Sequence, residues 1–213
     1  MGDASSAPRI YVLAGTNGAG KSSIAGSRIL GAGAEYFNPD EAARRILARN
    51  PGIRSEEANA AAWNEGRRLL ERAIDERLSF ALETTLGGST ITSLLERAMA
   101  SGIEVRVWYV GLDGPERHMA RVRARVARGG HDVPEATIRQ RYDRSRLNLI
   151  RLLPKLAELR LFDNSFEADP HAGKTPRPIL VLHMVEGVVK GPGDLSRTPG
   201  WARPIVAAAL KIA

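Results

Sequence analysis

The residues with the clearest chemical signature form a glycine-rich segment near the N-terminus. Residues 15–22 read GTNGAGKS and match the pattern G-x-x-x-x-G-K-[ST] at every fixed position. Glycines let several backbone N–H groups turn toward one anion, and a following helix N-terminus adds partial positive charge. The pattern therefore predicts a loop that binds the phosphates of ATP. The expected contacts are Gly15, Thr16, Asn17, Gly18, Ala19, Gly20, Lys21, Ser22 and Ser23. Lys21 is expected to reach the β- and γ-phosphates, and the Ser22 hydroxyl to hold Mg²⁺.

Two carboxylates follow predicted strands and bear on what receives a phosphoryl group. Asp40 comes after the strand expected at 35–38, and Glu83 ends the strand expected at 79–83. Carboxyl ends of parallel strands share one edge with such a loop, and ligands bind there. We therefore predict that Asp40 takes the proton from an acceptor hydroxyl. Two alternatives stay open: Asp40 as the N-cap of a helix over 41–49, and Glu83 as a solvated strand end. Asp163, at another strand end, is better explained by turn chemistry.

Positive charge is concentrated in one region of the chain. Twelve Lys and Arg against five Asp and Glu lie between Gly114 and Arg160, which equals the net +7 of the whole protein. Four arginines, at 117, 121, 125 and 128, recur at helical spacing on one face. Gly129-Gly130 separates this helix from another Arg-bearing one, which predicts a hinged lid over the phosphates. Arg125, Arg128 and Arg141 are expected to contact the transferring phosphoryl group, and most other arginines to form solvated faces.

Strands and helices alternate along the sequence. Strands are expected at 9–14, 35–38, 79–83, 103–110, 159–163 and 178–189, and helices at 21–30, 41–49, 56–77, 92–100, 115–128 and 134–153. This order predicts an α/β fold: a single P-loop NTPase domain with a mainly parallel sheet of about five to six strands. Helices are expected on both faces, with an Arg-rich lid over about 117–146. A flexible N-terminus (1–8), the kinase domain (9–190) and a Gly/Pro-rich C-terminal tail (191–213) complete the organisation, with 191–204 loosely ordered.

Composition excludes several classes of protein. The 213 residues are 43% hydrophobic and 26% charged, which suits one globular domain. No cysteine is present, so disulfides and thiolate metal sites are excluded, and the histidines lack metal-ligand spacing. The longest clean apolar run, 179–182, is too short for a membrane span, and the N-terminus lacks a secretion signal. We therefore expect a cytoplasmic protein without membrane contact.

Several segments together resemble the zeta toxin family of P-loop kinases, and its shorter stand-alone bacterial branch in particular. They are AGTNGAGKSS (14–23), FNPD (37–40), FALETTL (80–86) and RVRARVARGGHDVP (121–134), continued by 139–145 and 163–165. The resemblance spans roughly 9–165. It implies ATP-dependent phosphorylation of a sugar hydroxyl on UDP-N-acetylglucosamine or a related nucleotide sugar. It also implies Asp40 as the base, lid arginines on phosphate and acceptor binding at Glu83, with Asn38, Thr84 and Thr85 beside it. The family's second substrate carboxylate has no clear match here, Glu65 being the nearest acid. Neither toxicity nor an antitoxin follows from these residues.

Other readings of the P-loop remain. The nearest keeps the chemistry and changes the acceptor to a nucleoside, another sugar or a nucleic-acid end. A different class is a nucleotide-switched regulator or a nucleic-acid-binding ATPase that uses the basic region 114–160 as its contact surface. No N-K-x-D guanine-reading motif occurs, and only 5% of residues are aromatic, without an obvious stacking platform. These features argue against a GTPase switch and against nucleic acid as a partner.

Overall fold

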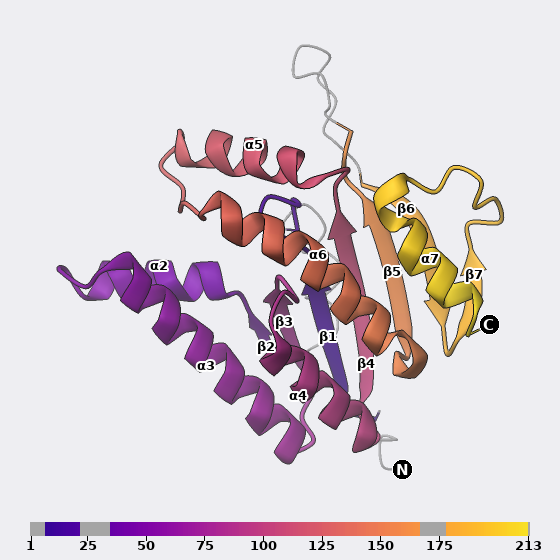
Figure 1. Ribbon diagram of the computed structural model, residues 1–213. Coiled ribbons are helices and arrows are strands. Elements are labelled where there is room, and N and C mark those ends of the chain that lie inside the picture. The colour runs from indigo at the N-terminus through magenta and orange to yellow at the C-terminus, as the bar shows by residue number, and fades with distance from the viewer. Residues whose placement is uncertain (1–6, 22–34, 167–177, 213) are drawn as a thin grey trace.

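A seven-stranded sheet is the centre of the protein (Figure 1). The computed structural model describes residues 7–21, 35–166 and 178–212. The strand order is β2-β3-β1-β4-β5-β6-β7, and the first five strands are parallel. These five are β1 (Arg9–Ala14), β2 (Glu35–Phe37), β3 (Phe80–Thr84), β4 (Glu104–Gly111) and β5 (Glu158–Asp163). The predicted α/β fold with a mainly parallel sheet is confirmed.

The sheet has one strand more than the five to six expected, because the last predicted strand is a hairpin. The segment expected as a single strand over 178–189 forms β6 (Ile179–Val185) and β7 (Val188–Gly191), which pair antiparallel. The chain reverses at Glu186 and Gly187, whose φ angles are 49° and 78°. Two successive residues with positive φ make the tight turn whose twist suits a two-residue hairpin.

Five of the described helices correspond to predicted ones, whereas the last one, in the C-terminal tail, was not predicted. The described helices are α2 (Pro39–Arg49), α3 (Ser55–Asp75), α4 (Ser89–Ala100), α5 (Pro115–Val126), α6 (Glu135–Leu152) and α7 (Arg203–Leu210), with 3-10 turns η2 (Leu153–Lys155) and η4 (Gly200–Ala202). The helix predicted at 21–30 lies outside the described residues. The α5 helix ends two residues before Arg128, where the prediction ended it. None of the described helices is both long and apolar enough to cross a membrane.

The main core lies between the sheet and the helices, with Ala42 and Ala43 of α2 among its buried residues. Ile10, Val12 and Ala14 alternate along β1 and face a buried cluster to which α3, α4, α6 and α7 all contribute. In Figure 1 these helices lie in front of the sheet. The lid has a small core of its own, in which Met119 and Val122 of α5 pack with Val133 and Ile138. This separate cluster holds α5 against α6 above the carboxyl ends of the strands.

The C-terminal tail packs on the main core, which differs from the loose order expected for residues 191–204. Trp201 is 4% exposed, and its ring stacks on Tyr109 of β4 with centroids 6.2 Å apart. The indole N–H donates to Asp163 Oδ1 at 3.0 Å. Gly111 makes room for the ring, since a Cβ there would lie 2.3 Å from the Trp201 side chain. The composition of residues 191–204 did not predict this contact. A single buried aromatic side chain contributes more buried area than several Gly and Pro neighbours together.

Candidate active site

The register of the parallel strands brings three predicted site segments to one edge of the sheet. Leu13 pairs with Glu83 and Ala14 with Thr84, so the P-loop leaves β1 beside the end of β3. On the other side of β3, Phe37 pairs with Leu82, which puts Asn38 next to Glu83. The carboxyl ends of these strands point upward in Figure 1, toward α5. The expected shared edge is therefore present.

The P-loop depends on glycine at its turns. Gly15, Gly18 and Gly20 have φ angles of 142°, 81° and 83°, which side-chain-bearing residues rarely adopt. A Cβ on Gly15 would lie 2.2 Å from the Val110 carbonyl oxygen of β4. The Lys21 ammonium is nearly buried and donates to the Gly15 carbonyl at 2.9 Å. Ser22 and Ser23, expected to hold Mg²⁺ and phosphate, lie outside the described residues.

Glu83 faces the P-loop lysine, so it is not a solvated strand end. Its Oε1 lies 3.4 Å from Lys21 Nζ, with both side chains nearly buried. Its Oε2 accepts hydrogen bonds from Tyr36 Oη and Asn38 Nδ2, each at 3.1 Å. Burial and the neighbouring Glu83 charge raise the pKa of Tyr36, so its hydroxyl stays protonated and keeps donating. The next two side chains turn back on their own loop: Thr84 Oγ1 accepts from Leu86 N, and Thr85 Oγ1 from Gly87 N.

Asp40 does not cap α2, contrary to the capping alternative for this residue. The N-cap is Asn38, whose Oδ1 accepts from the backbone N–H of Asp40 at 2.9 Å and of Glu41 at 3.3 Å. Pro39 at the first helical position has no N–H that would need a partner, which favours a start two residues earlier than expected. The Asp40 carboxylate is 53% exposed and lies 4.0 Å from Arg125 Nη1. It is thereby left available to solvent or a ligand.

Two of the three predicted lid arginines lie against this site. Arg125 faces Asp40, and its Nη2 donates to the His131 carbonyl at 2.8 Å. Its Nε is the buried side-chain nitrogen that finds no acceptor among the described residues. Arg141 Nη1 donates to Asn17 Oδ1 of the P-loop at 2.8 Å. Burial lowers the pKa of Arg141, and the negative charge of Asp40 opposes that shift. The Arg141 guanidinium therefore contacts the P-loop and also interacts electrostatically with the proposed base.

Arg128 is not brought to the site. Its side chain is exposed and its Nε donates to the Ala124 carbonyl of the preceding turn. In the described part of the chain it makes no contact with Asp40 or the P-loop. The lid loop is instead attached to α3, where Asn59 Nδ2 lies 3.3 Å from His131 Nε2. The exposed His131 side chain thus contacts α3.

Two side-chain contacts to the P-loop were not predicted from the sequence. His118 Nδ1 lies 2.8 Å from the Asn17 carbonyl oxygen, and Asn164 Nδ2 donates to the Ala19 carbonyl at 2.8 Å. Both partners belong to the P-loop, but they lie 101 and 145 positions away in the chain. The sequence offered only one hint, since Asn164 falls in a segment that resembles the family.

Comparison with known proteins gives the family. The sequence profile described as zeta toxin matches residues 2–164. The chain belongs to the zeta toxin family. An uncharacterized protein of Haemophilus influenzae is 33% identical over 128 residues, which is 60% of this chain and 88% of that one.

Solved structures share the fold. One chain of the AvrRxo1-ORF1:-ORF2 structure with ATP has a TM-score of 0.63 at 17% identity, covering 96% of this chain. This protein spans only 64% of that chain's length. A structure from the PezAT chromosomal toxin-antitoxin system of Streptococcus pneumoniae has a TM-score of 0.53 at 16% identity, covering 99% of this chain and 87% of that one. With its family match and the P-loop pattern at residues 15–22, this zeta toxin homologue is a P-loop phosphotransferase.

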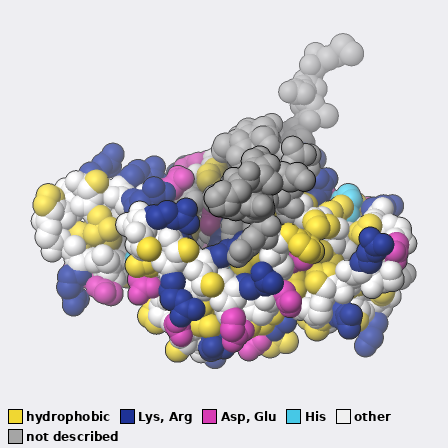
Figure 2. Space-filling view, turned by 90° about the horizontal axis from the view of Figure 1, so that it is seen from above, with side chains coloured by type: hydrophobic (Ala, Val, Ile, Leu, Met, Phe, Trp, Pro, Cys, Tyr) yellow, Lys and Arg dark blue, Asp and Glu magenta, His cyan; other side chains and the backbone are white. Residues whose placement is uncertain are grey.

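Some of the basic residues of the lid form ion pairs on the surface of this zeta toxin family member. Arg123 pairs with Glu135 and Arg139 with Glu116, each at 2.7 Å and largely exposed. Figure 2, which views the molecule from above, shows Lys and Arg spread across this face among Asp and Glu. Exposed pairs of this kind contribute little to stability, about 0–1 kcal/mol each. Part of the charge excess of this region is therefore a solvated surface, whereas Arg125 and Arg141 face the site.

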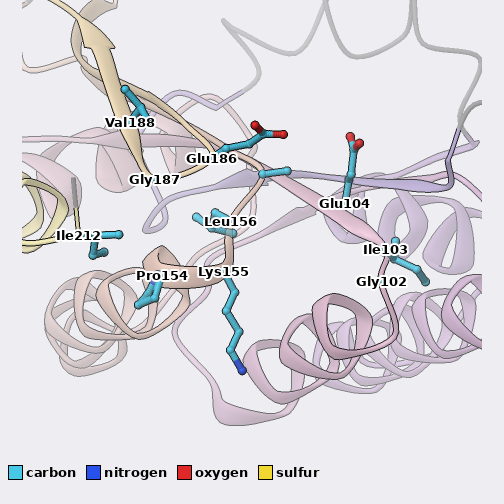
Figure 3. A pocket seen from close by; sticks show the side chains of 11 residues that line it. Gly102, Ile103, Glu104, Pro154, Lys155, Leu156, Glu186, Gly187, Val188 and Ile212 are labelled. Carbon is cyan, nitrogen blue, oxygen red and sulfur yellow. The ribbon is translucent and has the colours of Figure 1, made fainter.

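A cavity of about 530 Å³ lies away from the phosphotransferase site, beside the amino ends of β4 and β5. Glu104, Lys155, Glu186 and Ile212 are among its lining residues (Figure 3). In Figure 3 the two carboxylates point to one side and the Lys155 ammonium to the other. Glu104 is already paired with Arg9 and Arg106. The cavity therefore lacks a set of convergent polar groups and contains none of the predicted site residues.

Proposed function

We propose that this protein transfers the γ-phosphoryl group of MgATP to a hydroxyl of a nucleotide sugar, with UDP-N-acetylglucosamine as the acceptor. The observation that carries the proposal is the position of Asp40. Asn38 caps α2 in place of Asp40, so the Asp40 carboxylate makes no capping bond and is open to solvent. Its Oδ2 lies 4.0 Å from Arg125 Nη1. A carboxylate placed so can accept a proton from a bound hydroxyl as that oxygen attacks phosphorus.

The phosphate side of the reaction is assigned to the P-loop and the lid. The backbone N–H groups of residues 15–21 would bind the phosphates, and Lys21 would leave Gly15 and Glu83 to reach the β- and γ-oxygens. Arg141, bonded to Asn17, is placed to stabilise charge on the moving group. Arg125 needs an acceptor for its buried Nε, and a phosphate oxygen would supply one. Arg128 would join them only after a movement of the lid.

Magnesium fits the oxygen donors of this edge. Among the described residues no group of three or more acidic or histidine side chains could hold a metal alone. Mg²⁺ in kinases is bound by few protein oxygens, with substrate phosphates and water completing its shell. The Ser22 hydroxyl would be its protein ligand, and the ion would neutralise charge on the phosphates.

The acceptor is assigned to the side of the edge formed by β2 and β3. Glu83, with both oxygens turned toward this edge, would accept hydrogen bonds from sugar hydroxyls, and Thr84 and Thr85 would add hydroxyl contacts. Asn38 would serve by aiming Glu83 and by freeing Asp40, since its carboxamide contacts both. The choice of a nucleotide sugar rests on membership of the zeta toxin family.

The test is phosphoryl transfer from labelled ATP to a panel of nucleotide sugars, nucleosides and oligonucleotides. Wild type should label UDP-N-acetylglucosamine. Asp40→Asn should lower the transfer rate by a factor of about 10²–10⁴ while ATP still binds. Glu41→Gln removes the neighbouring carboxylate of the same helix and should leave transfer nearly unchanged. Near-normal transfer by Asp40→Asn would remove Asp40 from the base role, and label on another acceptor class alone would replace the nucleotide sugar.

A further inference from the structure

We propose that His118 and Asn164 are positioning residues that hold the P-loop in its phosphate-binding form. They do so from outside the loop, by donating hydrogen bonds to carbonyls on its outer side. The inference rests on the proposed binding of nucleotide phosphates at residues 15–21. It concerns two side chains that need not touch nucleotide or acceptor.

The argument begins with the backbone. The N–H and C=O of one peptide unit point in opposite directions, so amides that converge on an anion turn carbonyls into the protein. A buried carbonyl without a donor costs about 1–3 kcal/mol. The loop meets part of this need itself, since Ala19 N donates to Thr16 O and Lys21 Nζ to Gly15 O. The second of these bonds is lost once Lys21 turns to phosphate.

The Asn17 carbonyl accepts from His118, which is fixed on α5. His118 is 1% exposed, and its ring meets Tyr142 of α6 edge-on, with centroids 5.6 Å apart. Burial, together with the charges of Lys21, Arg121 and Arg146, lowers the pKa of His118 to about 4. The imidazole is therefore neutral at pH 7, and because a carbonyl only accepts, the proton is assigned to Nδ1. The contact of 2.8 Å is thus a directed N–H donation.

The Ala19 carbonyl accepts from Asn164, which is fixed at the end of β5. Asn164 is 5% exposed, its backbone N–H donates to Gly111 O at 3.0 Å, and its carbonyl accepts from Arg121 Nη2 at 2.7 Å. With its main chain bonded on both sides, Asn164 is held where its Nδ2 donates to the Ala19 carbonyl at 2.8 Å. Arg121 therefore acts on the loop indirectly, by fixing Asn164.

Close packing adds to these bonds. A Cβ on Gly18 would lie 2.6 Å from the His118 carbonyl oxygen and 3.3 Å from Val122 Cγ2. The backbone of α5 thus lies directly against the loop, between the two hydrogen-bonded carbonyls. The loss of either donor should therefore shift the backbone amides that face the phosphates.

The experiment measures affinity for MgADP by calorimetry, with steady-state kinetics for ATP. His118→Phe keeps an aromatic ring and removes the donor, and Asn164→Leu keeps volume and removes the donor. Each should weaken MgADP binding about tenfold, raise KM for ATP similarly and change kcat less than threefold, because the contact acts on ground and transition states alike. His118→Asn, which retains an N–H, should bind within threefold of wild type.

Asn148→Leu is the matched control. Asn148 Nδ2 also donates to a backbone carbonyl, that of Leu86 at 2.8 Å, but outside the P-loop. This variant should lose stability comparably and keep its MgADP affinity. Wild-type affinity in both His118→Phe and Asn164→Leu would overturn the inference, as would losses that follow thermal stability equally in all variants. If His118→Phe does not fold, a tenfold loss in a folded His118→Asn would overturn it as well. Absence of nucleotide binding by wild type would instead refute the proposed function.

Discussion

Truncation of Trp201 tests whether the C-terminal tail is a structural part of the kinase domain. The side chain is 4% exposed, stacks on Tyr109, fills the space above Gly111 and donates to Asp163. Trp201→Ala removes all of these contacts and leaves a cavity in the main core. Truncation of a buried Trp costs about 3–5 kcal/mol. A domain of this size has about 5–15 kcal/mol in total, so the variant should be severely weakened.

The matched control is Trp63→Ala on α3, where the same side chain is 45% exposed. It should cost about 1 kcal/mol or less, since little apolar area returns to water. Urea unfolding followed by far-UV circular dichroism gives both free energies without relying on tryptophan fluorescence. At about 2–4 °C per kcal/mol for a chain of this length, Trp201→Ala should melt roughly 10 °C lower.

A second variant separates packing from the hydrogen bond. Trp201→Phe keeps an aromatic ring and loses the indole N–H, while Asp163 Oδ1 retains its bonds from Ser165 N and Oγ. Because Asp163 stays partly satisfied, this change should cost about half as much as Trp201→Ala or less. A loss for Trp201→Ala no greater than that for Trp63→Ala would refute the reasoning, and the tail would then be a loosely attached segment.

Three further predictions concern the P-loop. Acidification from pH 6.5 to 4 should lower the free energy of unfolding by about 3 kcal/mol through His118, because the unfolded state binds a proton that the folded state binds only near pH 4. His118→Phe should reduce the dependence of the unfolding free energy on pH. An equal dependence in wild type and variant would contradict this prediction. Gly18→Ala should weaken ATP binding at least tenfold, because the new Cβ would contact α5. Gly102 has a similar positive φ, but a Cβ there would meet no atom within 4 Å, so Gly102→Ala should leave ATP binding unchanged. Equal effects of the two variants in a binding titration would exclude the steric cause. Glu83→Gln should tighten ATP binding about three- to tenfold, since Lys21 no longer has to leave an ionic partner to reach phosphate. The same variant should lose phosphoryl transfer. Weaker ATP binding by Glu83→Gln in calorimetry would refute the prediction.

Part of the site could be predicted because its determinants are local. The P-loop pattern fixes glycine at residues 15 and 20, and both have positive φ in the structure, as does Gly18 between them. The position of Asp40 and Glu83 at one edge with the loop followed from parallel pairing alone. The N-cap of α2 is Asn38, whereas Asp40 was the candidate for that position in the sequence. Asn and Asp are equally good N-caps, so residue type alone did not separate the two, although Pro39 indicated the earlier start.

Other features depended on contacts that no local pattern encodes. The seventh strand arose from a two-residue turn at Glu186-Gly187, a polar interruption within the segment that was predicted as one strand. Trp201 was misjudged by the composition of its neighbours, since burial depends on the space that Gly111 leaves in a distant strand. Among the three predicted lid arginines, Arg125 and Arg141 face the site, whereas Arg128 lies beyond the end of α5 and donates to the Ala124 carbonyl.

The sequence by itself determined that this protein has a P-loop, an α/β sheet and two carboxylates at the loop's edge. Those properties follow from backbone sterics and strand periodicity, which act over a few residues. Only the tertiary structure decided which groups hold the loop from outside, since His118 and Asn164 reach Asn17 and Ala19 from more than a hundred positions away. A buried carbonyl accepts from whichever donor the packed fold brings within 3 Å, and chain distance carries no information about that.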